Sequence, residues 1–143
     1  MAAALKTVIT GFRENVSGEL ERALRLLDMA KEFYGTSTLV GPLCVEAANA
    51  MIYSHNILQS MIGGERVPEL PEGTKLNGKM TDHATLKYLR QEITFVIGAV
   101  NDPFLRSTNE EYQAGAVLNI EKAAVVLAGR LEWFKSDNLF RVP

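Results

Sequence analysis

The side chains that most often do chemistry in proteins are scarce in this chain. It has two histidines, His55 and His83, and one cysteine, Cys44. A di-metal site in a helical protein needs Glu-x-x-His on two helices, and neither histidine has a glutamate three residues before it. The chain also lacks a nucleophile elbow, a P-loop and a dinucleotide-binding glycine motif. We therefore expect no metal, no cofactor and no catalytic site that a motif would reveal.

His55 lies in the middle of an apolar segment and has two interpretations. The first, which we prefer, is a core or interface histidine whose ring nitrogens are satisfied by hydrogen bonds. The second is a small-molecule pocket within the helices, lined by His55 and Tyr53. His83 is expected in the first turn of a helix, where a structural hydrogen bond is again the preferred interpretation.

The segment Pro42–Ile62 is the one around which the rest of the chain is expected to pack. It holds one formal charge, Glu46, and it is rich in alanine, leucine and methionine, which favour helix. A helix that is apolar or small nearly all round is buried on most of its surface. Polar residues such as Asn49 and Asn56 would each need a partner in hydrocarbon, which argues against a membrane span.

Apolar residues at helical spacing predict the remaining elements. Residues 5–34 form one helix, or two helices over about 4–15 and 18–34, because Gly11 and Gly18 weaken the pattern. Thr81 is expected to cap a third helix, which ends at Asn101-Asp102-Pro103. A fourth helix begins between residues 107 and 109, and Leu139 and Phe140 of the tail fold back onto the body of the protein. The chain shows no alternating pattern of a strand.

These elements predict an all-α fold, an up-down four-helix bundle with or without an additional N-terminal helix. At 143 residues the chain is expected to be a single domain, residues 1–143. The connection over residues 63–80 is long, and we interpret it as a solvated link between antiparallel helices. The net charge of −2 argues against a broad phosphate-binding surface. A lone Cys44 on an apolar helix fits a buried free thiol in the cytoplasm.

Four segments resemble the HEPN superfamily of helical nucleotide- and RNA-associated domains. LERALRLLDMAKEFY resembles its first helix, VEAANAMIYSHNILQSMIGG its second, KMTDHATLKYL the start of its third, and NEEYQAGAVLNIEKAAVVLAGRLEWF its last. The resemblance covers most of residues 17–136. It implies a helical bundle that works as a dimer, in many members as a ribonuclease or toxin without a metal.

The functional motif of that superfamily is an arginine followed four to six residues later by a histidine. Arg106 matches the arginine, but the position six residues later is Tyr112. A tyrosine can donate a hydrogen bond, yet it is a poor general base at neutral pH. Glu110 and Glu111 would also repel a phosphate there. The resemblance therefore implies a degenerate motif, with Arg106 and Tyr112 as its site residues.

Two functions follow from these observations. The first is a helical-bundle interaction protein without a catalytic site, which forms a homodimer or binds a protein partner. It rests on apolar surface left over on helix two, on Val117, Val125 and Val126, and on the tail. The competing expectation is that the segment around Ile9 and Phe12 covers this surface. The alternative function is a HEPN-like protein that acts on RNA or a nucleotide.

Overall fold

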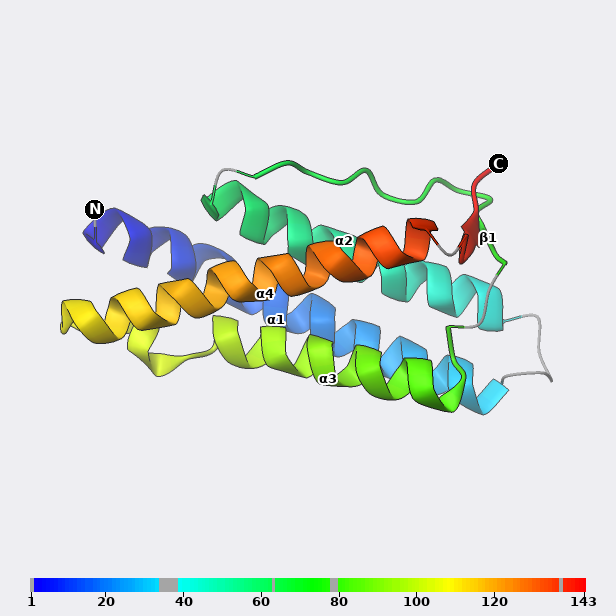
Figure 1. Cartoon of the computed structure of the whole chain (residues 1–143), viewed down its shortest axis with the longest axis horizontal. Coiled ribbons are helices and arrows are strands. Elements are labelled where there is room, and N and C mark those ends of the chain that lie inside the picture. Colours follow the sequence, from blue (N-terminus) through cyan, green and yellow to red (C-terminus); the bar gives the residue numbers. More distant parts are fainter. Residues whose placement is uncertain (1, 34–38, 63, 78–79, 137) are drawn as a thin grey trace.

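The computed structural model describes residues 2–33, 39–62, 64–77, 80–136 and 138–143, with the side chains of 2–12, 61–62 and 83 left aside. The described chain is predominantly helical, as the sequence predicts. Its four long helices run alongside one another: α1 (Ala2–Phe33), α2 (Val40–Ile62), α3 (His83–Val100) and α4 (Glu110–Ser136) (Figure 1). None of the described helices has a stretch long and apolar enough to cross a membrane.

The N-terminal segment is one continuous helix rather than two. Gly18 lies inside α1 without a break in the helix. A helical glycine costs about 1 kcal/mol relative to alanine. Val16 and Leu20, on either side of it, are fully buried, and this burial outweighs that cost. The expected cover by Ile9 and Phe12 depends on side chains outside the described ones.

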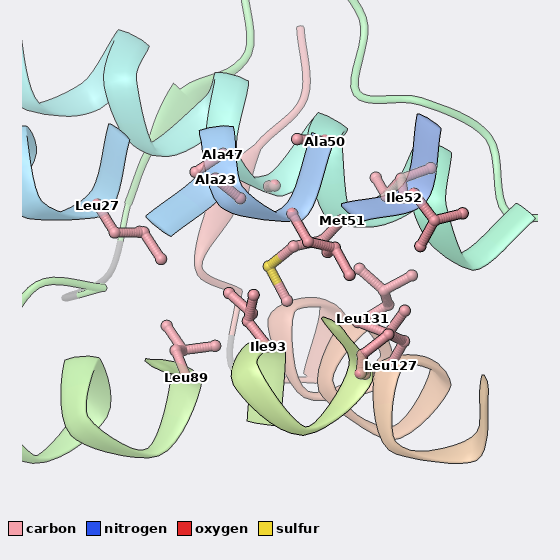
Figure 2. Close-up of a cluster of buried hydrophobic side chains, with 14 of the residues drawn as sticks. Ala23, Leu27, Ala47, Ala50, Met51, Ile52, Leu89, Ile93, Leu127 and Leu131 are labelled. Atoms are coloured by element: carbon pink, nitrogen blue, oxygen red, sulfur yellow. The ribbon is translucent and has the colours of Figure 1, made fainter. Parts of the chain in front are cut away.

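Helix α2 is buried along most of its length, but it packs mainly against α1 and α4, and α3 lies across the bundle from it, so the prediction that the whole chain packs around α2 holds only in part. Its buried residues face three sides and include Cys44, Ala47, Ala48, Ala50, Met51, Ile52 and Leu58. Figure 2 shows Met51 pointing from α2 towards Ile93 of α3 and Leu127 of α4. Ala47 lies beside Ala23 of α1 in the same view, so small side chains let these two backbones come close.

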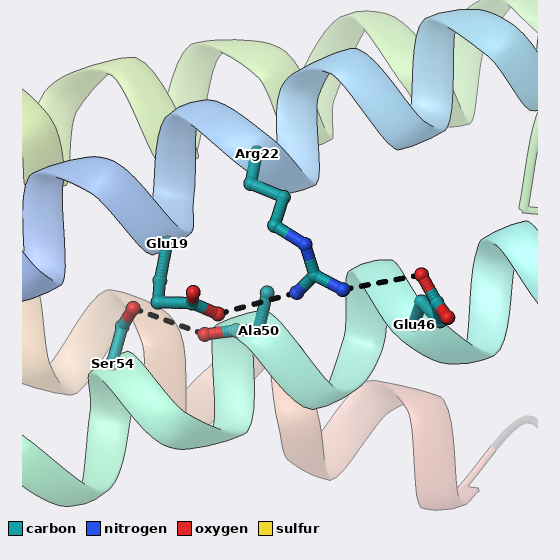
Figure 3. A network of polar contacts seen from close by, with 5 residues as sticks. All are labelled: Glu19, Arg22, Glu46, Ala50 and Ser54. Carbon is teal, nitrogen blue, oxygen red and sulfur yellow. Dashed lines mark hydrogen bonds and ion pairs between the residues drawn. The ribbon is translucent and has the colours of Figure 1, made fainter.

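Ion pairs tie α1 to its neighbours at the surface. Arg22 of α1 reaches Glu46 of α2 at 3.1 Å and Glu19 of its own helix at 3.3 Å (Figure 3). Arg90 of α3 reaches Asp28 of α1 at 2.5 Å. Exposed pairs of this kind contribute less than about 1 kcal/mol each, so burial of the helices dominates the packing.

The prediction that the chain has no strand is wrong. Two strands of two residues each, β1 (Lys75–Leu76) and β2 (Phe140–Arg141), pair antiparallel, with Leu76 opposite Phe140. Asn77 extends the pairing, because its N–H donates to the carbonyl of Leu139 at 2.7 Å. Strands this short have no periodicity that a sequence could reveal. They hold the tail on the body, as predicted: Leu139 is buried, and the Phe140 ring lies edge-on to Phe134 at 5.7 Å.

The boundaries of α3 differ in detail from the prediction. Asp82, not Thr81, is the N-cap, and its carboxylate accepts a hydrogen bond from the N–H of Thr85 at 3.2 Å. Thr81 is instead buried, and its hydroxyl has no hydrogen-bond partner within the described part of the chain. The end of α3 before Pro103 is confirmed. A short 3-10 helix, η1 (Pro103–Arg106), then leads to α4 and was not predicted.

Candidate functional site

The long connection after α2 is fastened to that helix by two asparagines. Residues 64–74, which we call the strap, run back along α2 towards its N-terminus (Figure 1). The Asn56 amide donates to the carbonyl of Val67 and accepts from its N–H, both at 2.8 Å. Asn49 does the same with Leu70, at 3.3 and 2.8 Å. Each side chain therefore satisfies both backbone groups of one strap residue.

The spacing of these contacts suits one straight strap. Asn49 and Asn56 lie two helical turns apart, a rise of about 10.5 Å. Val67 and Leu70 are three residues apart, which spans about 10 Å in extended backbone. The strap thus keeps in register with α2 without bending. The strap gives the two asparagines of this apolar helix hydrogen-bond partners. Most of its residues are exposed, as expected of a solvated link, but it is also bound to α2 at two points.

The Asn56 amide also fixes the orientation of His55, which is 2% exposed. The Asn56 oxygen that accepts from Val67 lies 3.2 Å from Nδ1 of His55. A carbonyl oxygen only accepts, so Nδ1 carries the ring hydrogen. Nε2 then accepts from the side-chain amide of Gln59 at 3.2 Å. Both ring nitrogens are satisfied, which agrees with the preferred interpretation of His55.

Gln59 is placed by the turn that ends α2. The N–H of Gly64 donates to the main-chain carbonyl of Gln59 at 3.0 Å. The side-chain oxygen of Gln59 lies where a Cβ on Gly64 would stand, 1.7 Å from that position. A glycine is required there for the Gln59 amide to keep its contact with His55.

A pocket of about 640 Å³ opens beside His55 and Gln59. Four segments line it: α2, the strap, the last two turns of α4 and the tail around β2. Its apolar walls include Ile52, Leu70, Leu131, Phe134 and Phe140. Clefts and cavities of about 300–1,000 Å³ with mainly apolar walls are typical of small-molecule sites.

The charged residues of this pocket are balanced in sign. Glu65 and Arg66 come from the strap, and Glu132 and Lys135 come from α4. All four are exposed, so they form its rim. The rim therefore carries no net charge.

Tyr53, expected beside His55, does not line this pocket. It is 38% exposed and lines a separate depression between α1 and α2, with Arg22 and Glu46. Residues two positions apart on a helix point to nearly opposite sides. The predicted pairing of Tyr53 with His55 is therefore wrong.

Arg106 and Tyr112 lie six residues apart in the sequence, near the N-terminal end of α4. Arg106 is the last residue of η1 and is exposed. Tyr112 is exposed too, and its ring packs on Phe104 at 5.2 Å. The buried Gln113 amide donates to the carbonyl of Leu105 at 3.0 Å and holds η1 against α4. Sixteen residues of helix, about 24 Å, separate Tyr112 from Ala128 in the pocket.

A third feature is the outer surface of the α3–α4 pair. Exposed or half-buried apolar side chains recur there seven residues apart, in one row on α3 and in two rows about 100° apart around α4. We call them the α3–α4 face: Tyr88, Phe95, Leu118, Val125, Val126 and Trp133. Tyr88 is 60% exposed and Val125 69%, whereas Val126 and Trp133 are half-buried. The tail is not part of this surface, contrary to the prediction, because Leu139 is buried.

A charged pair joins α3 to α4 within this face. Arg130 donates from Nε and Nη2 to the two oxygens of Glu92, at 2.7 and 2.5 Å. Its guanidinium also lies over the Trp133 ring, 4.7 Å from the centroid. The hydrogen bond to Glu92 raises the pKa of Arg130, although partial burial opposes it. Glu92 follows Tyr88 by four residues and precedes Phe95 by three, so these two aromatics flank the bridge.

The one cysteine of the chain, Cys44, is a free thiol in the core. Cys44 is fully buried, and burial raises its pKa from 9.0 to about 11. It is therefore a thiol rather than a thiolate at neutral pH, which makes it a poor nucleophile and metal ligand. Across the described residues, no three His, Cys, Asp or Glu side chains gather closely enough to hold a metal ion.

Sequence reasoning missed the strap and the walls of the pocket. The available signal was the pair Asn49 and Asn56, seven residues apart on an otherwise apolar helix. Such a pair indicates that something polar must lie along one line of α2, although it does not say what.

Comparison of the chain with protein-family models, curated proteins and solved structures finds no match.

Proposed function

We propose that this chain is a non-enzymatic helical interaction protein that forms a homodimer through the α3–α4 face. The observation that supports it most is the exposure of four large apolar side chains on two neighbouring helices: Tyr88, Phe95, Leu118 and Val125. Apolar patches of this kind usually mark an interface. A two-fold axis across the face would set each copy's patch against its equivalent, which is the commonest way to cover one.

Two glycines support the same surface. Gly98 of α3 follows Phe95 by three residues, and Gly129 of α4 follows Val125 by four. A Cβ built on either glycine meets no atom within 4 Å, so the packing within one chain does not require them. Each costs about 1 kcal/mol of helix stability relative to alanine. Close approach of another helix would explain why glycine stands there.

The proposal includes the finer features that the sequence predicts. The four helices form an up-down four-helix bundle, whose α1–α2 and α3–α4 pairs are each joined by a short connection. The protein works in the cytoplasm, where a lone buried thiol needs no partner. A second copy of the chain is the partner, and no cofactor takes part.

Sedimentation equilibrium at micromolar concentration tests the dimer. We expect twice the chain mass of 15.8 kDa, and we expect Val125→Glu to shift the protein to a monomer with its helix content intact. Met29→Glu is the matched control, because Met29 is an exposed apolar residue of α1, outside the face. A concentration-independent monomer of the unmodified chain would refute the proposal.

A second candidate function is supported by the closeness of Arg106 and Tyr112 in the sequence. In this alternative the chain is a HEPN-like protein that binds RNA or a nucleotide at the end formed by η1 and the start of α4. Arg106→Ala should then weaken RNA binding at low salt, where phosphate contacts are strongest. Arg141→Ala is the control, since Arg141 is an exposed arginine of β2. Binding that is absent at low salt, or equal in the two variants, would exclude this alternative.

A further inference from the structure

The pocket beside His55 has walls that come from distant parts of the sequence. Ile52 and His55 of α2 face Leu131 and Phe134 of α4, the strap forms a third side and Phe140 of the tail a fourth. The strap is held there by the two asparagine contacts, and the tail is held by its pairing with β1. Several specific contacts therefore hold the walls of this pocket of about 640 Å³ in place.

One side chain at the base of the pocket retains hydrogen-bonding capacity. Among the described residues, the Gln59 amide makes one side-chain hydrogen bond, the one to His55. Its second N–H is therefore available, whereas its oxygen lies against Gly64. The ring nitrogens of His55 are both used, so His55 acts by holding Gln59 rather than by meeting a ligand itself. A ligand with one hydrogen-bond acceptor would find its partner at Gln59.

The charged residues of the rim indicate which ligand charge the pocket favours. Glu65 and Glu132 oppose Arg66 and Lys135, so neither an anion nor a cation gains from the net field. A charged group inside the apolar walls would also lose its hydration without a buried counter-ion. These two arguments favour an uncharged molecule.

We propose that this pocket is a binding site for a neutral, mainly apolar small molecule that carries one hydrogen-bonding group. Its apolar body lies between Ile52, Leu131 and Phe140, and its polar group meets the amide of Gln59. The site goes beyond the proposed dimer, because the pocket is lined by α2, α4, the strap and the tail and by no residue of the α3–α4 face. Either proposal can therefore fail alone.

A matched set of naphthalenes tests the ligand class. The probes are 2-naphthol, naphthalene, naphthalene-2-sulfonate and 2-naphthylmethylammonium, which share one apolar body and differ in a single group. Titration calorimetry at pH 7 should give the tightest binding for 2-naphthol. We expect roughly tenfold weaker binding for each charged probe, because its charge must be desolvated.

Ala128 allows the pocket to be filled without touching its polar base. It lines the α4 wall and is half-buried. Ala128→Leu adds three carbons to that wall, so we expect it to weaken 2-naphthol binding at least about tenfold while the melting temperature stays the same or rises. Ala114→Leu is the control, since it makes the same change at an exposed position of the same helix.

Gln59→Met tests the polar contact at nearly constant volume. We expect it to weaken 2-naphthol roughly five- to tenfold and to leave naphthalene almost unchanged, because only naphthol uses the amide. Naphthalene binding in this variant also reports whether the pocket has survived. Equal binding of all four probes, no binding of any, or equal effects of Ala128→Leu and Ala114→Leu would each overturn the proposal.

Discussion

The contact between Asn56 and the strap is open to a quantitative test by Asn56→Ala. The change removes the two hydrogen bonds to Val67 and the acceptor that faces His55. A hydrogen bond contributes about 0.5–1.5 kcal/mol net, and leaving a buried partner unsatisfied costs about 1–3 kcal/mol. Val67 is half-buried, so water can replace part of its loss. We therefore expect the free energy of unfolding to fall by about 2–4 kcal/mol.

Asn49→Ala should cost less. Asn49 makes the same pair of bonds to Leu70, one of them long at 3.3 Å, and among the described residues it has no hydrogen bond to a histidine. We expect a loss of about 1–2 kcal/mol. The double variant should lose less than the sum of the two, because a strap that is free at one end already weakens its other attachment.

Urea denaturation measures these losses, and hydrogen exchange locates them. The amides of Val67 and Leu70 donate to the two asparagines, so Asn56→Ala should speed exchange at Val67 more than at Leu70. Asn119→Ala is the control, because Asn119 is half-buried on α4 and makes no side-chain hydrogen bond with the described residues. It should change stability by less than about 0.5 kcal/mol. Unprotected Val67 and Leu70 amides in the unmodified chain, or equal losses in Asn56→Ala and Asn119→Ala, would refute the reasoning.

Three further outcomes follow from the geometry of the helices. Because burial raises the Cys44 pKa from 9.0 to about 11, the unfolded chain ionises first, and stability should fall by about 2–3 kcal/mol between pH 9 and 11; denaturation curves of Cys44→Ala should lack this component. Arg130→Lys loses the two-point contact with Glu92 and the stacking on Trp133, so we expect a loss of about 0.5–1.5 kcal/mol and altered tryptophan fluorescence; an unchanged spectrum would contradict it. Gly129→Ala should weaken the dimer in sedimentation although alanine favours helix; a tighter dimer would place Gly129 outside the interface.

The helices and their core were within reach of the sequence because helical periodicity is a local signal. The spacing of Val16, Leu20 and Leu27 in α1 shows their buried side without knowledge of what covers it. The same logic identified α2 as a largely buried helix. Helical spacing also argues against the predicted pairing of Tyr53 with His55, because residues two positions apart point to nearly opposite sides of a helix.

The strap and the sheet depend on contacts between segments far apart in the chain. Lys75 meets Arg141, and Asn49 meets Leu70. No local pattern at either position contains its partner. The pocket combines four such segments, so its existence could not be read from any one of them. Arg106 and Tyr112 differ, because both residues belong to one short stretch of the sequence.

The strap links the two properties that the structure supports best, its attachment to α2 and the pocket beneath it. Val67 and Leu70 line the pocket, and both are bound by the asparagines. A molecule that occupies the pocket only when the strap is bound to α2 shifts the equilibrium towards the bound strap. At a free ligand concentration [L], it multiplies the equilibrium constant for strap attachment by 1 + [L]/Kd. At a concentration of one hundred times Kd, 2-naphthol should therefore slow exchange of the Val67 amide by up to about 100-fold. Asn56→Ala should lower the affinity for 2-naphthol in proportion to the fraction of molecules in which the strap has left α2. Binding of 2-naphthol with unchanged exchange at Val67 would separate the pocket from the strap and show that the ligand lies elsewhere.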